Sequence, residues 1–342
     1  MIHNHRNRNT YISLITAFAL MAVGYTVFIS LAATPEIKVE PENSTLSNPE
    51  LAISDSGASG GKAVLFKEIT STGGGATGGG TSGGGTGGSF LIAAAGDIAQ
   101  NSGAEKGTSD IIYNDTSINT VLTLGDNAYE NGLIDEFTQK YEPTWGRFKD
   151  KTKPSPGNHE YQSGGAGYYE YFQGVQQYYS FDVNDWHFVS LNGDIDHSAS
   201  STQVTWLKND LAASTKKCTL AYWHEPRFTA GSHDDDTSMT PFWDAFYASG
   251  VDVVLNGHSH TYERFAPSKP DGSVDAVNGI REFVVGTGGA DMSQGGNTVA
   301  TREFSDASNY GVLKMNLSAT GYDWKFITSG GQTIDPGTGT CH

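Results

Sequence analysis

The sequence predicts a layered α/β domain between residues 90 and 342, with its functional side chains at the ends of strands. Three observations support this prediction. Short apolar runs recur along this part of the chain, amphipathic segments lie between some of them, and polar side chains directly follow several runs. Apolar runs of about four to six residues without strict alternation are typical of strands buried on both faces. Strands of this kind combined with helices indicate an α/β or α/β/α arrangement of layers.

The predicted strands are the apolar runs themselves. They cover residues 90–95, 120–124, 186–191, 218–223, 251–255 and 282–285. Residues 201–214 predict a helix because their apolar side chains recur at helical spacing. Residues 239–250 predict a second helix, since Pro241 lies near the start and Gly250 at the end, as helix boundaries favour. His187 lies near the start of the third run, and we expect it to be a histidine of the core or the sheet.

The N-terminal segment predicts export. Its first ten residues contain Arg6 and Arg8 and no acidic residue, and an apolar run covers residues 11–33. A basic flank before an apolar run is typical of a secretory signal peptide or a signal anchor, and this run is long enough to span a bilayer. We therefore expect a secreted or extracytoplasmic protein. Residues 1–33 are either a signal peptide that is cleaved or a membrane anchor that is retained.

Two polar segments precede the predicted domain. Residues 34–70 contain few aromatic side chains and predict a disordered arm, in which the apolar patch 63–66 is either one strand or nothing. Residues 71–89 consist mainly of Gly, Ser and Thr, a composition typical of a flexible linker. A phosphate-binding loop would need a strand before it, a helix after it and a Lys-Ser/Thr end. The folded domain is therefore expected at 90–342.

Charge and cysteine content exclude several classes of protein. The chain contains 21 basic and 38 acidic residues, for a net charge of −17. Because nucleic-acid binding needs a basic face, we expect no nucleic acid as a structural partner. Cys218 and Cys341 are too few for a disulfide scaffold or a four-thiolate zinc site. Export would allow these two residues to form a disulfide bond, and free thiols are the alternative.

Potential metal ligands follow five of the predicted strand ends or loops. They are Asp97, Asp126, Asn127, Tyr129, Asn158, His159, His224, His258 and His260. In open α/β sheets, ligands bind beyond the carboxyl ends of strands. We therefore expect these side chains to meet at one rim. A mixture of histidines and carboxylates suits zinc, iron or manganese better than calcium.

The order of these motifs resembles the calcineurin-like metallophosphoesterases, and it resembles their purple acid phosphatase branch most closely. The motifs read GDIA, GDNAY, GNHE, YWHEP and GHSHTYER, starting at residues 96, 125, 157, 222 and 257. The resemblance covers residues 90–342. It implies a β-sheet sandwich flanked by helices, with the active site at the carboxyl ends of the strands.

One departure from the wider superfamily concerns the first motif. Most members carry Asp-x-His there, whereas Asp97 is followed by Ile98 and Ala99. The purple acid phosphatase pattern replaces the missing histidine by the tyrosine of GDxxY, which is Tyr129. A tyrosinate is a hard anionic ligand that favours trivalent iron. A tyrosine of the core is the alternative for Tyr129.

The resemblance implies a centre with two metal ions. The first ion would be held by Asp97, Asp126, Tyr129 and His260. The second would be held by Asp126, Asn158, His224 and His258, with Asp126 as the bridge. Fe³⁺ is expected at the tyrosine site, with Zn²⁺, Mn²⁺ or Fe²⁺ at the other. His159 is expected to protonate the leaving group or to stabilise charge. His233 is expected to contact the substrate as a second catalytic histidine, and a place in an exposed acidic loop is the alternative.

The implied function is an exported acid phosphatase that hydrolyses phosphate monoesters of small molecules by attack of a metal-bound hydroxide. A phosphodiesterase or nucleotidase on the same centre is one alternative. A surface-displayed binding domain without catalysis is another, which the complete ligand set argues against. Residues 162–180 contain several aromatic side chains that are either a substrate loop or surface packing.

Overall fold

The computed structural model describes residues 90–101, 103–231, 233, 235–293 and 299–342, together with two short strands nearer the N-terminus. The chain divides into two compact units, residues 1–82 and residues 83–342. In the first unit, β1 (Ala52–Ser54) pairs antiparallel with β2 (Lys62–Val64). The second unit contains all the other described elements.

The predictions for the N-terminal part are only partly within the described residues. β2 overlaps the apolar patch at 63–66, and the disordered arm over residues 34–70 stays a prediction. The predicted export segment 1–33 and the linker 71–89 lie outside the described residues. No described helix is long and apolar enough to cross a membrane.

The larger unit contains a six-stranded sheet with the order β15-β14-β13-β3-β4-β5. Its strands are β3 (Phe90–Ala95), β4 (Thr120–Leu124), β5 (Thr152–Ser155), β13 (Gly311–Ser318), β14 (Gly321–Thr328) and β15 (Thr333–Thr340). β3, β4 and β5 run parallel, whereas β13 joins β3 antiparallel and continues into an antiparallel β13-β14-β15 meander. The parallel half therefore gathers three strand ends at one edge.

The second sheet has seven strands in the order β12-β10-β11-β9-β8-β7-β6. They are β6 (Tyr179–Val183), β7 (Trp186–Ser190), β8 (Cys218–Tyr222), β9 (Val253–Asn256), β10 (Tyr262–Phe265), β11 (Arg281–Val285) and β12 (Arg302–Asp306). β7, β8, β9 and β11 are parallel, and β6, β10 and β12 pair antiparallel with their neighbours. β7, β8 and β9 are buried at almost every position, as expected for strands covered on both faces.

The two sheets pack face to face. Aromatic pairs bridge them, with ring centroids 4.3 Å apart for Tyr262 and Phe326 and 5.4 Å apart for Phe283 and Trp324. Offset and edge-on rings at these distances stabilise the interface beyond their area burial. The structure therefore confirms the predicted layered α/β fold with a β-sandwich at its centre.

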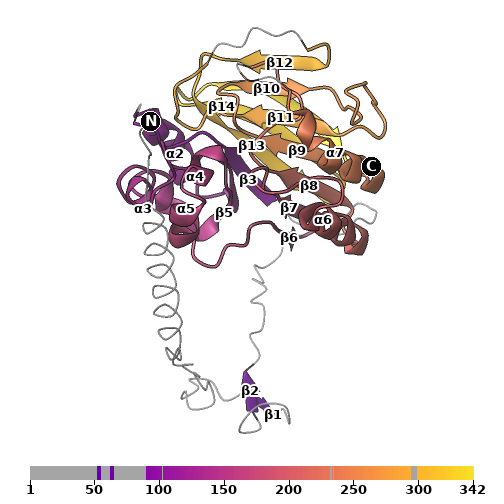
Figure 1. Ribbon diagram of the computed structural model, residues 1–342, viewed down its shortest axis with the longest axis horizontal. Helices are drawn as coiled ribbons and strands as arrows, with labels where there is room; N and C mark the ends of the chain where they lie inside the picture. The colour runs from indigo at the N-terminus through magenta and orange to yellow at the C-terminus, as the bar shows by residue number, and fades with distance from the viewer. Residues whose placement is uncertain are drawn as a thin grey trace, which may run out of the picture. The chain divides into compact units, whose positions relative to one another are not determined.

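Helices cover the outer faces, with α2 to α5 beside the six-stranded sheet and α6 and α7 beside the seven-stranded sheet (Figure 1). They are α2 (Ala104–Tyr113), α3 (Ile134–Glu136), α4 (Asn158–Tyr161), α5 (Ala166–Tyr171), α6 (Thr202–Ala213) and α7 (Thr240–Ser249). Shorter helical turns are η3 (Phe137–Tyr141), η4 (Trp145–Lys151) and η5 (Thr237–Met239). A separate apolar cluster joins α6 and α7 to the seven-stranded sheet.

The predicted helices form where their boundary signals lie. Ser201 caps α6, because its side-chain oxygen accepts a hydrogen bond from the Val204 backbone N–H. Pro241 lies in the first turn of α7, and Gly250 ends it with a left-handed φ of 69°. Cys218 and Cys341 form a disulfide bond, which confirms the predicted pair and ties the C-terminal tail to the start of β8.

Candidate metal centre

The predicted ligands lie at the carboxyl ends of parallel strands from both sheets. Asp97 follows β3, Asp126 follows β4, and the loop after β5 leads to Asn158. From the other sheet, His224 follows β8 and His258 follows β9. The loops are joined by backbone hydrogen bonds, including Asp97 N–H to Gly125 carbonyl (3.1 Å) and Gly257 N–H to His224 carbonyl (2.9 Å). The sandwich therefore brings distant segments to one rim.

Two motif glycines allow the side chains to approach the backbone closely. A Cβ atom on Gly125 would lie 2.5 Å from the His224 ring. A Cβ atom on Gly157 would lie 2.4 Å from the Asp126 Oδ1 atom. Both contacts are too short for any other residue without a backbone shift, so these glycines are part of the geometry of the site.

The first predicted ligand set converges around Tyr129. Its hydroxyl lies 3.0 Å from Asp97 Oδ1, 3.1 Å from Asp126 Oδ2 and 3.3 Å from His260 Nε2. His260 Nε2 also lies 3.3 Å from Asp97 Oδ1. Tyr129 is 1% exposed and Asp97 is fully buried. These oxygen and nitrogen atoms therefore converge on one small, mostly buried region.

The second predicted set shares Asp126 with the first. His224 Nε2 lies 3.1 Å from Asp126 Oδ2, and His258 Nδ1 lies 3.3 Å from His224 Nε2. Asp97, Asp126 and His224 each offer one ligand atom within 4.8 Å of the others. Asn158 begins α4 beside this group, and its Oδ1 atom is buried without a hydrogen-bond partner among the described residues.

Backbone carbonyls fix the orientation of two candidate histidine ligands. His224 Nδ1 lies 2.8 Å from the Leu124 carbonyl, and His260 Nδ1 lies 2.7 Å from the Asp291 carbonyl. A carbonyl oxygen only accepts, so each Nδ1 carries the hydrogen and donates it. The Nε2 atoms, which point at the carboxylates, are then the atoms available to a metal.

The residues fit a metal centre. Carboxylate, phenol and imidazole acceptors face one another at short distances, and such groups repel unless a proton or metal cation lies among them. The Asn158 Oδ1 atom, which has no hydrogen-bond partner among the described residues, is a further oxygen that could bind a metal. The donor set of oxygens and imidazole nitrogens suits iron, zinc or manganese.

The pKa shifts show how strongly negative this environment is. Burial alone would lower the pKa of His224 and of His260, but Asp126 raises the first well above its ordinary value and Asp97 raises the second to about 9. Burial raises the pKa of the Tyr129 phenol, and the carboxylates of Asp97 and Asp126 raise it further. A bound metal cation would instead lower the pKa of the Tyr129 phenol, because the cation attracts the phenolate.

His159 lies at the open side of the centre. Its Nδ1 atom lies 2.6 Å from the Glu130 carbonyl, and its Nε2 atom lies 3.8 Å from Asp126 Oδ2. Its ring centroid is 4.3 Å from that of Tyr129, and a quarter of its side chain is exposed. Since Nδ1 donates to the carbonyl, Nε2 is the ring nitrogen that faces the candidate metal centre.

His233 lies beside the second ligand set. Its ring centroid is 4.1 Å from that of His258, at an interplanar angle of 32°. Burial, followed by the positive charge of His260, lowers its pKa. The structure therefore places both predicted catalytic histidines next to the predicted ligands.

Glu160 is a residue of the site that the sequence analysis missed. Its fully buried carboxylate accepts hydrogen bonds from the backbone N–H groups of Asn127 (2.9 Å), Ala128 (3.0 Å) and Gly157 (2.9 Å). It thereby joins the loop that carries Asp126 to the loop that carries Asn158. The only available signal was its place in the GNHE motif, which does not reveal these backbone partners.

Comparison with known families decides the classification. The calcineurin-like phosphoesterase family matches residues 90–262, a segment that contains every predicted metal ligand. The chain belongs to the calcineurin-like phosphoesterase family. Its resemblance to the purple acid phosphatase branch is confirmed by similar sequences that are themselves named purple acid phosphatases.

Two relatives illustrate the extent of this similarity. Purple acid phosphatase 15 of Arabidopsis thaliana is 30% identical, over 51% of this chain and 40% of the relative. Acid phosphatase type 7 of Homo sapiens is 27% identical, over 48% of this chain and 44% of the relative. The chain thus matches less than half of the length of either protein.

Solved structures share the fold at low sequence identity. The purple acid phosphatase PPD1 of yellow lupin (Lupinus luteus) has a TM-score of 0.63 at 19% identity, covering 73% of this chain and 53% of that chain. GAP50 of Plasmodium, described as the anchor in the inner membrane complex, also has a TM-score of 0.63, at 13% identity and with coverage of 74% and 89%. These neighbours confirm the architecture.

Proposed function

We propose that the chain is an exported phosphoesterase with two metal ions that hydrolyses phosphate monoesters of small molecules. The observation that carries the proposal is the convergence of the predicted ligands on two sets that share Asp126 Oδ2. The named relatives support the reaction class. Two ions at such a site polarise phosphoryl oxygens, neutralise developing charge and lower the pKa of water.

The two ligand sets suggest different metals. Asp97, Asp126, Tyr129 and His260 would hold Fe³⁺, because a phenolate oxygen is a hard anionic donor. Asp126, Asn158, His224 and His258 would hold Zn²⁺, Mn²⁺ or Fe²⁺. Tyr129 supports this assignment by its position, since its hydroxyl contacts three other members of the first set.

His159 would supply the proton for the leaving group. Its Nδ1–H group is held by the Glu130 carbonyl, so the doubly protonated ring can donate only from Nε2. After that transfer, the ring remains neutral with its hydrogen on Nδ1 and the same carbonyl contact. His233, whose ring centroid lies 4.1 Å from that of His258, would contact the substrate from the neighbouring side. General acid catalysis of this kind contributes about 10²–10⁴-fold to a rate.

Export is supported by two features of the chain. The basic flank and apolar run within residues 1–33 have the order of a secretory signal or anchor. The Cys218–Cys341 disulfide is typical of proteins in oxidising compartments. The excess of acidic residues argues against a nucleic acid as a partner.

The alternatives use the same fold. A phosphodiesterase or nucleotidase would need the same ligands and differ in contacts to the leaving group. A binding domain without catalysis has a structural precedent in GAP50, which is described as an anchor. The complete ligand set favours catalysis, because a binding role alone gives no reason for these acceptors to face one another.

The test compares two chromogenic esters. Metal-loaded full-length protein is assayed with 4-nitrophenyl phosphate and bis(4-nitrophenyl) phosphate, beside His159→Ala and with metal content measured in each sample. We expect a higher kcat/KM for the monoester, and a loss of about 100-fold or more in His159→Ala at unchanged metal content. Preference for the diester would favour the first alternative. Full metal loading without turnover of either ester would contradict the proposal.

A further inference from the structure

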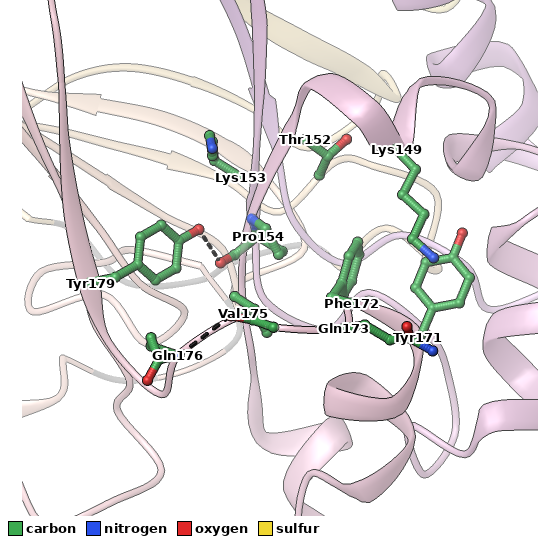
Figure 2. Close-up of a pocket in the computed structure, with 11 residues that line it drawn as sticks. Lys149, Thr152, Lys153, Pro154, Tyr171, Phe172, Gln173, Val175, Gln176 and Tyr179 are labelled. Atoms are coloured by element: carbon green, nitrogen blue, oxygen red, sulfur yellow. Dashed lines mark hydrogen bonds between the residues drawn. The ribbon is translucent and has the colours of Figure 1, made fainter. Parts of the chain in front are cut away.

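The pocket between β5, the end of α5 and the start of β6 is lined in part by buried aromatic side chains (Figure 2). Tyr171 and Phe172 are each 6% exposed, and the Phe137 ring stacks on Tyr171 at 4.9 Å. None of the residues that line this pocket is a predicted metal ligand or catalytic histidine. These rings of residues 162–180 therefore serve as packing, and we look for further functional residues at the rim that carries the ligands.

At that rim, His233 lies on a loop that is closed at its base. The Asp236 N–H donates to the Pro226 carbonyl (3.3 Å), and the Thr229 N–H donates to Asp235 Oδ1 (2.8 Å). His233 itself is exposed, whereas the first part of the loop, residues 229–231, is buried. Because the His233 side chain is exposed, its position depends on the contacts that hold the buried part of the loop.

The buried part of the loop is held by the carboxylate of Glu263, which is fully buried. The Ala230 N–H lies 3.2 Å from Oε1 and 3.1 Å from Oε2, and the Thr229 hydroxyl donates to Oε2 (2.8 Å). Arg302 of β12 contributes an ion pair, with Nη1 3.3 Å from Oε1. Burying a carboxylate is costly unless it is paired and hydrogen-bonded. Of these three partners, two belong to the loop that carries His233.

The Thr229 hydroxyl also connects this loop to the ligand segment 258–260. Ser259 is fully buried between the two ligands, and its Oγ atom lies 2.9 Å from Thr229 Oγ1. The same Oγ1 atom accepts a hydrogen bond from the Gly231 N–H (3.0 Å). Glu263 lies in β10, which begins shortly after the ligand segment. Thr229 therefore links the buried carboxylate, the ligand segment and the backbone that leads to His233.

Gly231 allows the loop to lie directly against the ligand segment. A Cβ atom on Gly231 would lie 2.7 Å from Ser259 Cβ and 2.8 Å from Ser259 Oγ. Any other residue at this position would therefore force the loop and the ligand segment apart. The distance between them is set by this close contact and by the Thr229 hydroxyl together.

We propose that Thr229 and Glu263 are positioning residues, which hold the loop on the ligand segment so that His233 faces the substrate. The inference rests on the proposed function, in which His233 contacts the phosphate ester. Both residues are buried and act through His233 rather than on the substrate. A displacement of about 1 Å in a substrate contact can lower a rate about 100-fold, so a hydroxyl outside the site can control turnover.

The first measurement is hydrogen exchange in full-length, metal-loaded Thr229→Val, which keeps the shape of the side chain and removes the hydroxyl. The buried Gly231 N–H then loses its acceptor, and we expect the amides of residues 229–231 to exchange about tenfold faster. Thr229→Ser, which retains a hydroxyl, should exchange like the parent protein. Thr328→Val is the matched control, because the buried Thr328 hydroxyl also accepts from a backbone N–H, that of Gln332 (3.0 Å).

The second measurement is a double-mutant cycle on the hydrolysis of 4-nitrophenyl phosphate, with kcat/KM referred to the metal-loaded protein. Thr229→Val should lower kcat/KM about tenfold, as expected for a displaced substrate contact, whereas Thr229→Ser should remain close to the parent protein. In the His233→Ala background, Thr229→Val should have no further effect, because the side chain that it positions is absent. Gly231→Ala, which removes no polar group, should show the same faster exchange and the same dependence on His233.

Three results would overturn the proposal. They are equal loop exchange in Thr229→Val and Thr328→Val, an unchanged kcat/KM in Thr229→Val, and a loss of kcat/KM that persists in the His233→Ala background. A metal-loaded parent protein that hydrolyses neither 4-nitrophenyl ester would contradict the proposed function instead. The exchange measurement needs no turnover, so in that case it decides by itself whether Thr229 holds the loop.

Discussion

Three candidate ligands adopt a backbone conformation that is unfavourable for their residue type. Asp97, Asp126 and His258 have φ angles of 59°, 48° and 67°. Left-handed conformations cost about 1–3 kcal/mol at residues other than glycine. The surrounding hydrogen bonds hold them there, since Asp97 Oδ2 accepts from the His258 N–H and Asp126 Oδ1 accepts from the His159 N–H. The left-handed conformations thus lower the stability of the fold while they orient the candidate ligands.

Glu160 provides a prediction at the residue scale. In Glu160→Gln, the side-chain oxygen can still accept from Asn127 and Ala128, but the amide group would oppose the Gly157 N–H as donor against donor. The two ligand-bearing loops would then be less well aligned. Loss of a partner that orients metal ligands typically lowers metal affinity about 10–100-fold. We expect a loss of this size in Glu160→Gln, measured by titration against a competing chelator.

The control for this change is Glu170→Gln, which alters an exposed carboxylate ten positions along the chain. It should leave metal affinity unchanged. Saturating metal should restore much of the activity of Glu160→Gln, because the ligands themselves remain. Equal metal affinity in Glu160→Gln and the parent protein would contradict the positioning role.

The predicted ligands could be found from the sequence because each lies directly after a buried apolar run or within a short motif. Asp97 and Asp126 are separated by a whole strand and helix, yet the parallel β3 and β4 bring them together. Glu160 could not be found in this way. Its partners are backbone N–H groups, which have no sequence signature, and Asn127 lies 33 positions away.

At the scale of elements, the predictions succeeded for strands that are continuous apolar runs. β3 and β4 have the predicted bounds, and β7 and β8 differ from prediction by one residue. The other strands of the two sheets, β5, β6, β10, β12, β13, β14 and β15, were not predicted. β12 and β15 alternate between partly buried and exposed positions, whereas β5, β10 and β13 are mostly buried but contain polar residues that interrupt the apolar run. β15 also contains Pro336 and two glycines, so its pairing with β14 rather than its own composition makes it a strand.

His187 provides a prediction at this scale, because it joins three elements. From β7, its Nδ1 atom lies 2.7 Å from Asp182 of β6 and its Nε2 atom 2.9 Å from Asp210 of α6. Burial would lower the pKa of His187, but these two hydrogen-bonded carboxylates outweigh burial and raise it. The protonated ring therefore stabilises the fold. This contribution is complete below the unfolded pKa of about 6.5 and is lost as pH rises through the raised folded pKa.

His187→Gln should accordingly lower the free energy of unfolding by about 2 kcal/mol at pH 5, the scale of hydrogen bonds to charged groups, and by less at pH 9. Urea denaturation at both pH values measures the difference. His197→Gln is the control, because His197 contacts a backbone carbonyl and the Ser238 hydroxyl, and its effect should be similar at both pH values. A pH-independent loss in His187→Gln would refute the charged contact.

At the scale of the whole molecule, the disulfide restrains a large part of the chain. Cys218 and Cys341 are 123 positions apart, and their bond ties the segment after β15 to the start of β8. The chain-entropy estimate for a loop of this length is about 5 kcal/mol. The double variant Cys218→Ala/Cys341→Ala should therefore show a clearly lower Tm in calorimetry. An unchanged Tm would mean that the unfolded chain is already restrained without the bond.

The fold itself was predictable at this scale, because buried parallel strands followed by polar residues permit few arrangements. The division into two facing sheets came only from the family resemblance. Periodicity does not reveal which strands share a sheet, and contacts such as Tyr262 with Phe326 join residues far apart in the sequence.

The most direct test of the central claim is the visible absorption spectrum of the full-length protein produced with iron available, measured beside Tyr129→Phe with the metal content of both samples. The proposed centre predicts a tyrosinate-to-Fe³⁺ charge-transfer band that disappears in Tyr129→Phe. A fully metallated protein without this band, or a band that persists in Tyr129→Phe, would contradict the assignment of Tyr129 as a ligand to trivalent iron.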